Sequence, residues 1–94
     1  MSDLLDESQI EDALKKLPDW ELDGSSITRT IEFEEFMEGI DFINDLAELA
    51  DEANHHPDIQ IQYTKVTLTL TTHDANGLTE ADLDMAQRID NLVD

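Results

Sequence analysis

The chain has 94 residues, a length that predicts one domain spanning residues 1–94 with one modest core. Its 24 acidic and 5 basic side chains give a net charge of −19, which argues against nucleic acid or anionic membrane as a partner because both would be repelled. Cysteine is absent, which excludes disulfides, thiolate nucleophiles and zinc–thiolate sites. The sequence has no run of 18 apolar residues and begins with acidic residues, so we expect no membrane span, no signal peptide and a cytoplasmic location.

The acidic residues are spread along the whole chain rather than collected in a tail. An acid-rich interaction module is one interpretation, and a halophilic protein adapted to a salty cytosol is the one we favour. At ~1 M salt the Debye length is about 3 Å, so repulsion among the carboxylates is mostly screened. At low salt the same repulsion should destabilise the compact state. The composition therefore predicts stability that rises with salt concentration.

The N-terminal segment predicts a tail followed by a helix. Residues 1–7 are expected to form a frayed acidic tail. Ser8 and Glu11 have the spacing of a capping box, in which each side chain bonds a backbone N–H of the first helical turn. Pro18 ends this helix, because the residue before a proline disfavours the α region.

A short hairpin and a long helix are predicted next. Residues 20–23 form a short strand, a turn containing Gly24 follows, and alternating apolar residues predict a second strand over 27–33. From about residue 34 to residue 54 the apolar period changes to that of a helix. The face predicted to be apolar consists of Phe36, Ile40, Ile43, Ala47 and Ala50.

The C-terminal half predicts a second hairpin and a third helix. Apolar residues alternate over 59–63 and again over 66–71, with a turn near Thr64-Lys65. A loop over 73–77 follows, and Thr79 is the predicted N-cap of the last helix. The order α-β-β-α-β-β-α predicts an α+β fold, a four-stranded antiparallel sheet with helices covering one face.

The only three histidines flank the second hairpin: His55 and His56 precede it and His73 follows it. An unperturbed imidazole titrates near pH ~6.5, so it can give or take a proton at neutral pH. The cluster therefore favours general acid–base chemistry. Zinc is the rival use of three histidines, but adjacent histidines seldom reach one tetrahedral ion together and no thiolate is available, so we predict no metal.

A longer pattern surrounds these histidines. It consists of Asp51-Glu-Ala-Asn-His55-His56-Pro57, Tyr63, Thr71-Thr72-His73, Gly77-Leu78-Thr79 and Asp82. These residues and spacings closely resemble the signature of the pterin-4a-carbinolamine dehydratases. The resemblance spans roughly Ile10 to Ile89 and is far more specific than a single short motif.

The resemblance implies a fold and a reaction. The implied fold has a four-stranded antiparallel sheet and three helices, in agreement with the element order predicted above. The implied activity is dehydration of a 4a-hydroxy-tetrahydropterin to the quinonoid dihydropterin, without a metal or an organic cofactor. The family usually assembles as dimers or tetramers, so a homodimer or homotetramer is expected. The alternative is a non-enzymatic dimerisation or coactivator-type binding module on the same fold, since some animal members are partners of a transcription factor.

Site residues follow from the resemblance position by position. His55, His56 and His73 match the pocket histidines. We expect His55 and His73 to transfer protons, while His56 orients the substrate or substitutes for one of them. Which histidine is the acid and which is the base stays open. The expected substrate-binding residues are Asp51, Pro57, Thr72, Asp74, Ala75 and Asp82.

Positions 51, 59 and 82 each carry a further expectation. Asp51 stands where the family most often has glutamate, and its carboxylate could accept hydrogen bonds from the amino and ring N–H edge of a pterin. Ile59 stands where many members have tryptophan, which predicts a pocket without that aromatic wall. Asp82 is three residues beyond the predicted N-cap, where an acid stabilises the helix dipole, and we rank that role above direct catalysis.

Overall fold

The structure of the chain is a computed structural model that describes residues 4–93. The elements are α1 (Glu7–Lys15), β1 (Glu21–Asp23), β2 (Ser26–Glu32), α2 (Phe36–Ala53), β3 (Asp58–Gln62), β4 (Lys65–Leu70), the short 3₁₀ helix η1 (His73–Ala75) and α3 (Glu80–Val93). The predicted α+β class and the order helix, two strands, helix, two strands, helix are confirmed. Among the described residues, no helix combines the length and the apolar character that a membrane crossing requires.

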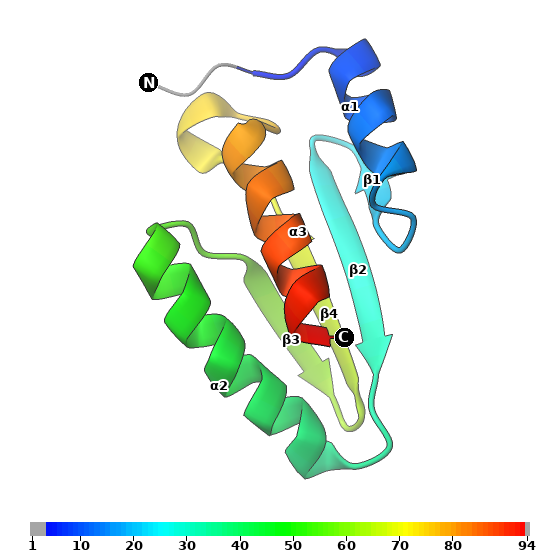
Figure 1. Cartoon of the computed structure of the whole chain (residues 1–94), viewed down its shortest axis with the longest axis vertical. Coiled ribbons are helices and arrows are strands. Elements are labelled where there is room, and N and C mark those ends of the chain that lie inside the picture. The colour runs from blue at the N-terminus through cyan, green and yellow to red at the C-terminus, as the bar shows by residue number, and fades with distance from the viewer. Residues whose placement is uncertain (1–3, 94) are drawn as a thin grey trace.

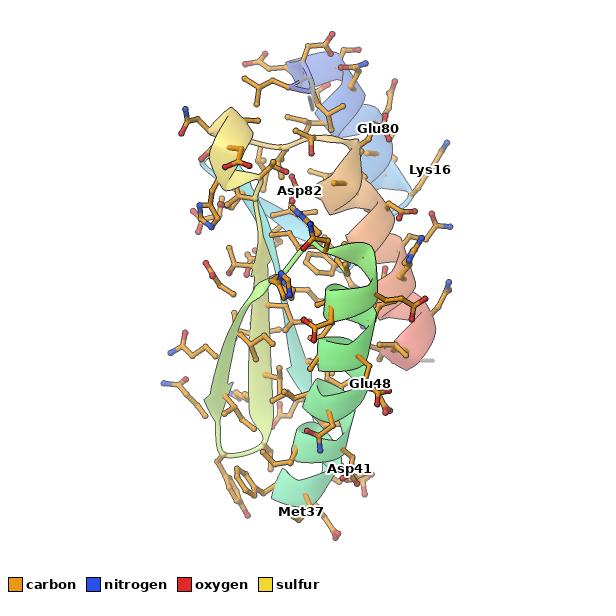
Figure 2. All side chains as sticks on the ribbon, turned by 90° about the vertical axis from the view of Figure 1, so that its left-hand side faces the viewer. Lys16, Met37, Asp41, Glu48, Glu80 and Asp82 are labelled. Carbon is orange, nitrogen blue, oxygen red and sulfur yellow. The ribbon has the colours of Figure 1, made fainter. Side chains whose placement is uncertain are left out.

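The four strands form one antiparallel sheet in the order β1-β2-β4-β3. Figures 1 and 2 show α2 and α3 side by side on one face of it. Strand residues alternate between the faces, so β2 and β4 turn their aliphatic side chains toward the helices and their threonines away. The fully buried strand residues are Ile27, Val66, Leu68 and Leu70. The core therefore lies between the two central strands and the two long helices.

The buried face of α2 differs from the predicted face. Phe36 is 42% exposed and Ala47 is also exposed, whereas the buried residues of the helix are Gly39, Phe42, Leu46 and Ala50. The sequence offers two overlapping stripes at helical spacing, and contact with the sheet selects the second. The acidic residues Asp41 and Glu48 of this helix are exposed and point away from the sheet (Figure 2).

The start of α1 also differs from the prediction. The N-cap is Asp6 rather than Ser8, and the capping box pairs Asp6 with Gln9. Of the predicted tail, residues 1–3 lie outside the described residues, while the backbone N–H of Leu5 donates to Leu78 O at 2.9 Å. A carboxylate is as good a cap acceptor as a hydroxyl, which explains why Asp6 can take this position.

The turn between β3 and β4 consists of Tyr63 and Thr64, one residue earlier than predicted. Tyr63 has φ 55° and is 76% exposed. The expected continuation of the strand through Tyr63 is therefore wrong, and its ring contributes little to the core. A two-residue hairpin turn commonly requires positive φ at its first central position, which explains the conformation.

A polar cluster ties the first hairpin to the end of α3. The Trp20 indole Nε1–H donates to Asp90 Oδ1 at 2.8 Å, and Arg29 on β2 pairs with the same carboxylate. The side chain of Arg29 is 13% exposed and that of Asp90 is 22% exposed. Asp19 lies 3.5 Å from the guanidinium on its outer side. One of the five cations of this acidic chain is thus committed to holding the fold.

Candidate active site

The three histidines arrive at one end of the sheet because β3 and β4 are antiparallel. Asp58, the first residue of β3, lies opposite Thr69 near the end of β4. His55 and His56 come just before β3, and His73 comes just after β4. The register of this hairpin therefore brings the predicted catalytic residues to the same edge of the molecule.

The end of α2 sets the position of His55. Asn54 adopts the left-handed conformation at φ 52°, and the His55 backbone N–H donates to Ala50 O at 3.1 Å. This is the geometry of a helix C-terminus closed by a left-handed residue. Pro57 is buried immediately before β3. The segment between α2 and β3 is thus fixed at both of its ends.

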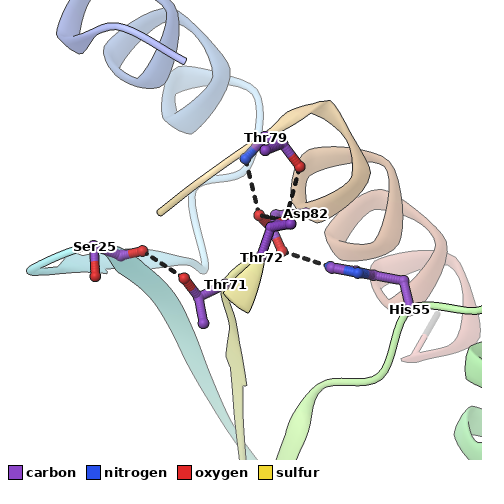
Figure 3. A network of polar contacts seen from close by, with 6 residues as sticks. All are labelled: Ser25, His55, Thr71, Thr72, Thr79 and Asp82. Carbon is purple, nitrogen blue, oxygen red and sulfur yellow. Dashed lines mark hydrogen bonds and ion pairs between the residues drawn. The ribbon is translucent and has the colours of Figure 1, made fainter. Parts of the chain in front are cut away.

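The carboxylate of Asp82 lies against the His55 ring and joins three elements (Figure 3). His55 Nε2 lies 2.6 Å from Asp82 Oδ1. Asp82 Oδ2 accepts hydrogen bonds from the Thr72 hydroxyl at 2.7 Å and from the Thr79 backbone N–H at 2.9 Å. The Asp82 side chain is 0% exposed and that of His55 is 17% exposed. A fully buried carboxylate is therefore satisfied by three donors, one of which is an imidazole.

This arrangement selects a tautomer of His55. Because a carboxylate oxygen only accepts hydrogen bonds, Nε2 is the ring nitrogen that carries the proton toward Asp82. In the neutral ring, Nδ1 is then left with a free lone pair. Asp82 also accepts the N–H of Thr79 just before α3, so the predicted helix-start role is present together with the contact to His55.

His56 has a different environment. Its Nε2 donates to Asp51 Oδ1 at 2.8 Å, and both side chains are exposed, at 58% and 83%. Such a pair in water contributes little to stability. The structure thus places the predicted substrate-binding carboxylate of Asp51 beside the second histidine, at the solvent edge of the site.

His73 is an exposed residue at the start of η1, in a loop closed at its neck. Thr72 and Gly77 pair as an isolated bridge, with the Thr72 N–H donating to Gly77 O at 2.9 Å. Asp74 is exposed and Ala75 is half-buried within the same loop. Asp74 and Ala75, which are both predicted site residues, thus lie in the same loop as His73.

A recess of about 630 Å³ lies elsewhere, between α1 and α3. Ala13, Leu17 and Leu83 supply its apolar lining, and none of the three histidines takes part. Within residues 4–93, no three histidine, aspartate or glutamate side chains converge in an arrangement that could hold a metal ion. We therefore locate the candidate site on the histidine network rather than in this recess.

Two features of the network were not predicted. The link between His55 and Asp82 joins residues 27 positions apart. The hydroxyl of Thr79, predicted only as a cap, lies 2.8 Å from the Thr72 hydroxyl. Sequence spacing connects Thr79 with Asp82 through the helix start, but no local signal indicates that the carboxylate also reaches the end of α2.

Comparisons with known proteins identify relatives of this chain. The model of the family described as pterin 4 alpha carbinolamine dehydratase matches residues 3–92. A Cyanothece protein provisionally named pterin-4-alpha-carbinolamine dehydratase is 50% identical over 92 residues, which cover 98% of this chain and 95% of the relative.

Two solved structures have the same architecture. A Brucella melitensis protein described as a transcriptional coactivator/pterin dehydratase superimposes with a TM-score of 0.93 at 35% identity, covering 98% of this chain and all of that one. A pterin dehydratase-like protein identified as a RuBisCO assembly factor in the alpha-carboxysome gives a TM-score of 0.65 at 27% identity, covering 78% and 84% of the two chains. The chain belongs to the pterin-4-alpha-carbinolamine dehydratase family.

Proposed function

We propose that this protein is a hydro-lyase that dehydrates a 4a-hydroxy-tetrahydropterin to the quinonoid dihydropterin. In this reaction the C4a–O bond breaks, the hydroxyl leaves with an added proton as water, N5 loses its proton, and the C4a=N5 bond forms. The net change is the loss of one water molecule, with no redox step. Two proton transfers are therefore needed, and imidazoles suit both.

The observation that carries the proposal is the buried Asp82 carboxylate against His55 Nε2. It fixes the tautomer in which Nδ1 is the proton acceptor, and its negative charge stabilises the imidazolium that forms when Nδ1 takes a proton. The same logic operates wherever a buried aspartate supports a catalytic histidine. We accordingly assign His55 as the base that receives the N5 proton, with Asp82 as a positioning residue rather than a substrate contact.

His73 is then the acid that protonates the leaving 4a-hydroxyl. Its ring stands on a solvent-exposed loop, where it can be reprotonated from water after each turnover. His56, paired with Asp51, orients the substrate at the outer edge. Pro57, Asp74 and Ala75 are proposed to line the site, because they flank the histidines on the same two segments.

The test is a dehydration assay on a synthetic 4a-hydroxy-tetrahydropterin in molar salt, following the absorbance of the quinonoid product. The wild-type protein should accelerate the loss of water well above the buffer rate, and His55→Gln should lose most of that acceleration. Asp84→Asn is the matched control, since Asp84 is an exposed residue of α3 that pairs with Arg88 at the surface. A wild-type rate equal to the buffer rate would refute the proposal.

A second candidate is a protein-binding module, and exposed apolar residues of α2 favour it. At the start of this helix Phe36 is 42% exposed and Met37 is 61% exposed. Figure 2 shows Met37 at this end of the helix. Such a surface suits assembly, and we propose that the protein forms a homodimer or homotetramer. Light scattering of the purified protein at molar salt should give a mass of two or four chains. Copurification with a different protein, combined with no dehydration activity, would favour the module over the enzyme.

A further inference from the structure

We infer that Thr72 is a positioning residue that holds the His73 loop in register with His55, acting through the buried carboxylate of Asp82. The inference rests on the proposed function, because it specifies how two proton-transfer groups on separate loops keep one relative placement. Thr72 is the last residue before His73, and its hydroxyl reaches the carboxylate that supports His55.

The hydrogen bonds form a chain with one direction. The Thr72 hydroxyl has a single proton, which it donates to Asp82 Oδ2. The 2.8 Å contact between the two hydroxyls must then run from Thr79 to Thr72. The order is Thr79 Oγ1–H to Thr72 Oγ1–H to Asp82, with His55 donating to the other carboxylate oxygen. In a site shielded from water, the hydrogen bonds of such a chain polarise one another, and each bond fixes the orientation of the next hydroxyl.

The backbone around Thr72 explains why this anchor acts on His73. The Thr72–Gly77 bridge closes the loop at its neck, and Thr72 O also accepts the N–H of Ala75 at 3.1 Å. A shift of Thr72 therefore moves the whole loop. The hydroxyl bond to Asp82 ties this neck to α3, whereas the loop itself is exposed at His73. The hydrogen bond between Thr72 and Asp82 therefore joins the His73 loop to the carboxylate that supports His55.

The neighbouring threonine offers a natural contrast. Thr71 makes a hydrogen bond of similar length, 2.9 Å, but its partner is Ser25 O in the turn of the first hairpin, away from His55 (Figure 3). Thr71 and Thr72 are consecutive residues just after β4, and their side chains bond to different parts of the molecule, Ser25 and Asp82. A role in positioning predicts that only Thr72 matters for turnover. A role in substrate binding predicts a change in KM, but the only hydroxyl proton of Thr72 is already committed to Asp82.

The test compares Thr72→Val and Thr72→Ala with Thr72→Ser, and uses Thr71→Val as the matched control. In the dehydration assay, Thr72→Val and Thr72→Ala should lower kcat roughly 10-fold with KM changed by less than about 2-fold, because one bond to a charged group is removed. Thr72→Ser should restore kcat to within about 2-fold of the wild type, and Thr71→Val should match the wild type. Thr72→Val places a methyl group against the Thr79 hydroxyl. If this variant does not fold, Thr72→Ala provides the same test.

A second measurement does not depend on activity. The chain has three histidines, so its imidazole ¹⁵N NMR spectrum contains three rings that single substitutions can assign. Thr72→Val should shift the ring signals of both His55 and His73, and Thr71→Val should shift neither. Equal effects of the two substitutions, or a rise in KM with unchanged kcat in Thr72→Val, would overturn the inference. If the wild type lacks dehydratase activity, the NMR comparison still decides whether Thr72 links the two rings.

Discussion

Two aspartates of α3 gather polar side chains, and the two clusters do different work. Asp82, near the start of the helix, is 0% exposed and accepts from the imidazole of His55 and from Thr72 and Thr79. Asp90, two turns later, is 22% exposed and accepts from the indole of Trp20 and from Arg29. Both carboxylates bridge the helix to distant parts of the chain.

The donors distinguish the two clusters. An arginine side chain stays protonated in proteins, and an indole N–H does not titrate. The donors to Asp90 therefore have one protonation state, and this cluster serves as a structural clamp. The Asp82 cluster instead contains the imidazole of His55, whose second ring nitrogen, Nδ1, carries a lone pair that can accept a proton. One residue type on one helix therefore supports the fold at one end and proposed chemistry at the other.

The largest expected effect is the loss of dehydration activity when a proposed proton-transfer residue is replaced. His73→Ala should reduce dehydration activity by roughly 10²- to 10⁴-fold, the usual contribution of a positioned acid or base. His73 is exposed, so the melting temperature should stay close to that of the wild type. Turnover by this variant close to the wild-type rate would remove His73 from the mechanism.

Exchanging each aspartate for asparagine separates the two clusters. In Asp82→Asn, the amide oxygen should keep the side that accepts from Thr72 and Thr79, so the NH₂ group faces His55 and opposes the reactive tautomer. Activity should fall on the order of 10- to 100-fold, the equivalent of one hydrogen bond to a charged group. Asp90→Asn should keep activity within about 2-fold. Similar activity losses in both variants would show that the Asp82 and Asp90 clusters do not differ in their contribution to activity.

The structural clamp should respond in stability instead. Arg29→Met removes the cation that faces Asp90 and leaves a mostly buried carboxylate with the Trp20 indole as its remaining donor. We expect a loss of about 1–3 kcal/mol in the free energy of unfolding, measured by urea denaturation, with specific activity retained in the folded fraction. Arg88→Met is the control, because Arg88 pairs with Asp84 at the surface and should contribute less than about 1 kcal/mol. Equal losses in the two variants would contradict a clamp at Asp90.

The contrast also shows what the sequence could predict. Element order and the two hairpins follow from local periodicity and turn residues, which involve neighbours within about ten positions. The two ends of the histidine set, His55 and His73, are 18 positions apart in sequence, and the sequence places them at one edge only because they flank the same hairpin. The buried face of α2 was misassigned because Phe36 and Phe42 belong to two stripes of equal periodicity. Only contact with the sheet decides between them.

Both aspartate clusters escaped prediction for a different reason. Arg29 and Asp90 are 61 positions apart, and Trp20 is 70 positions from the same carboxylate. Asp82 was correctly expected at the helix start, yet its contact with His55 depends on how α3 packs against the end of α2. Polar contacts between distant segments leave no period in a sequence, so they become visible only when the fold places them together.

Salt should produce the smallest effect, and it acts on neither cluster in particular. The acidic residues that give the net charge of −19 lie mostly at exposed positions, for example on the solvent-facing sides of α1 and α2. Screening at ~1 M salt reduces this repulsion, while the buried carboxylate of Asp82 is shielded from added ions. We propose a salt-adapted protein whose melting temperature rises by at least about 4 °C between dilute buffer and ~1 M KCl, the shift that about 1 kcal/mol produces in a domain of this size. Because the gain comes from the whole surface, Arg29→Met should gain about as much as the wild type. A melting temperature that is flat across this range would mean that the acidic surface has another use.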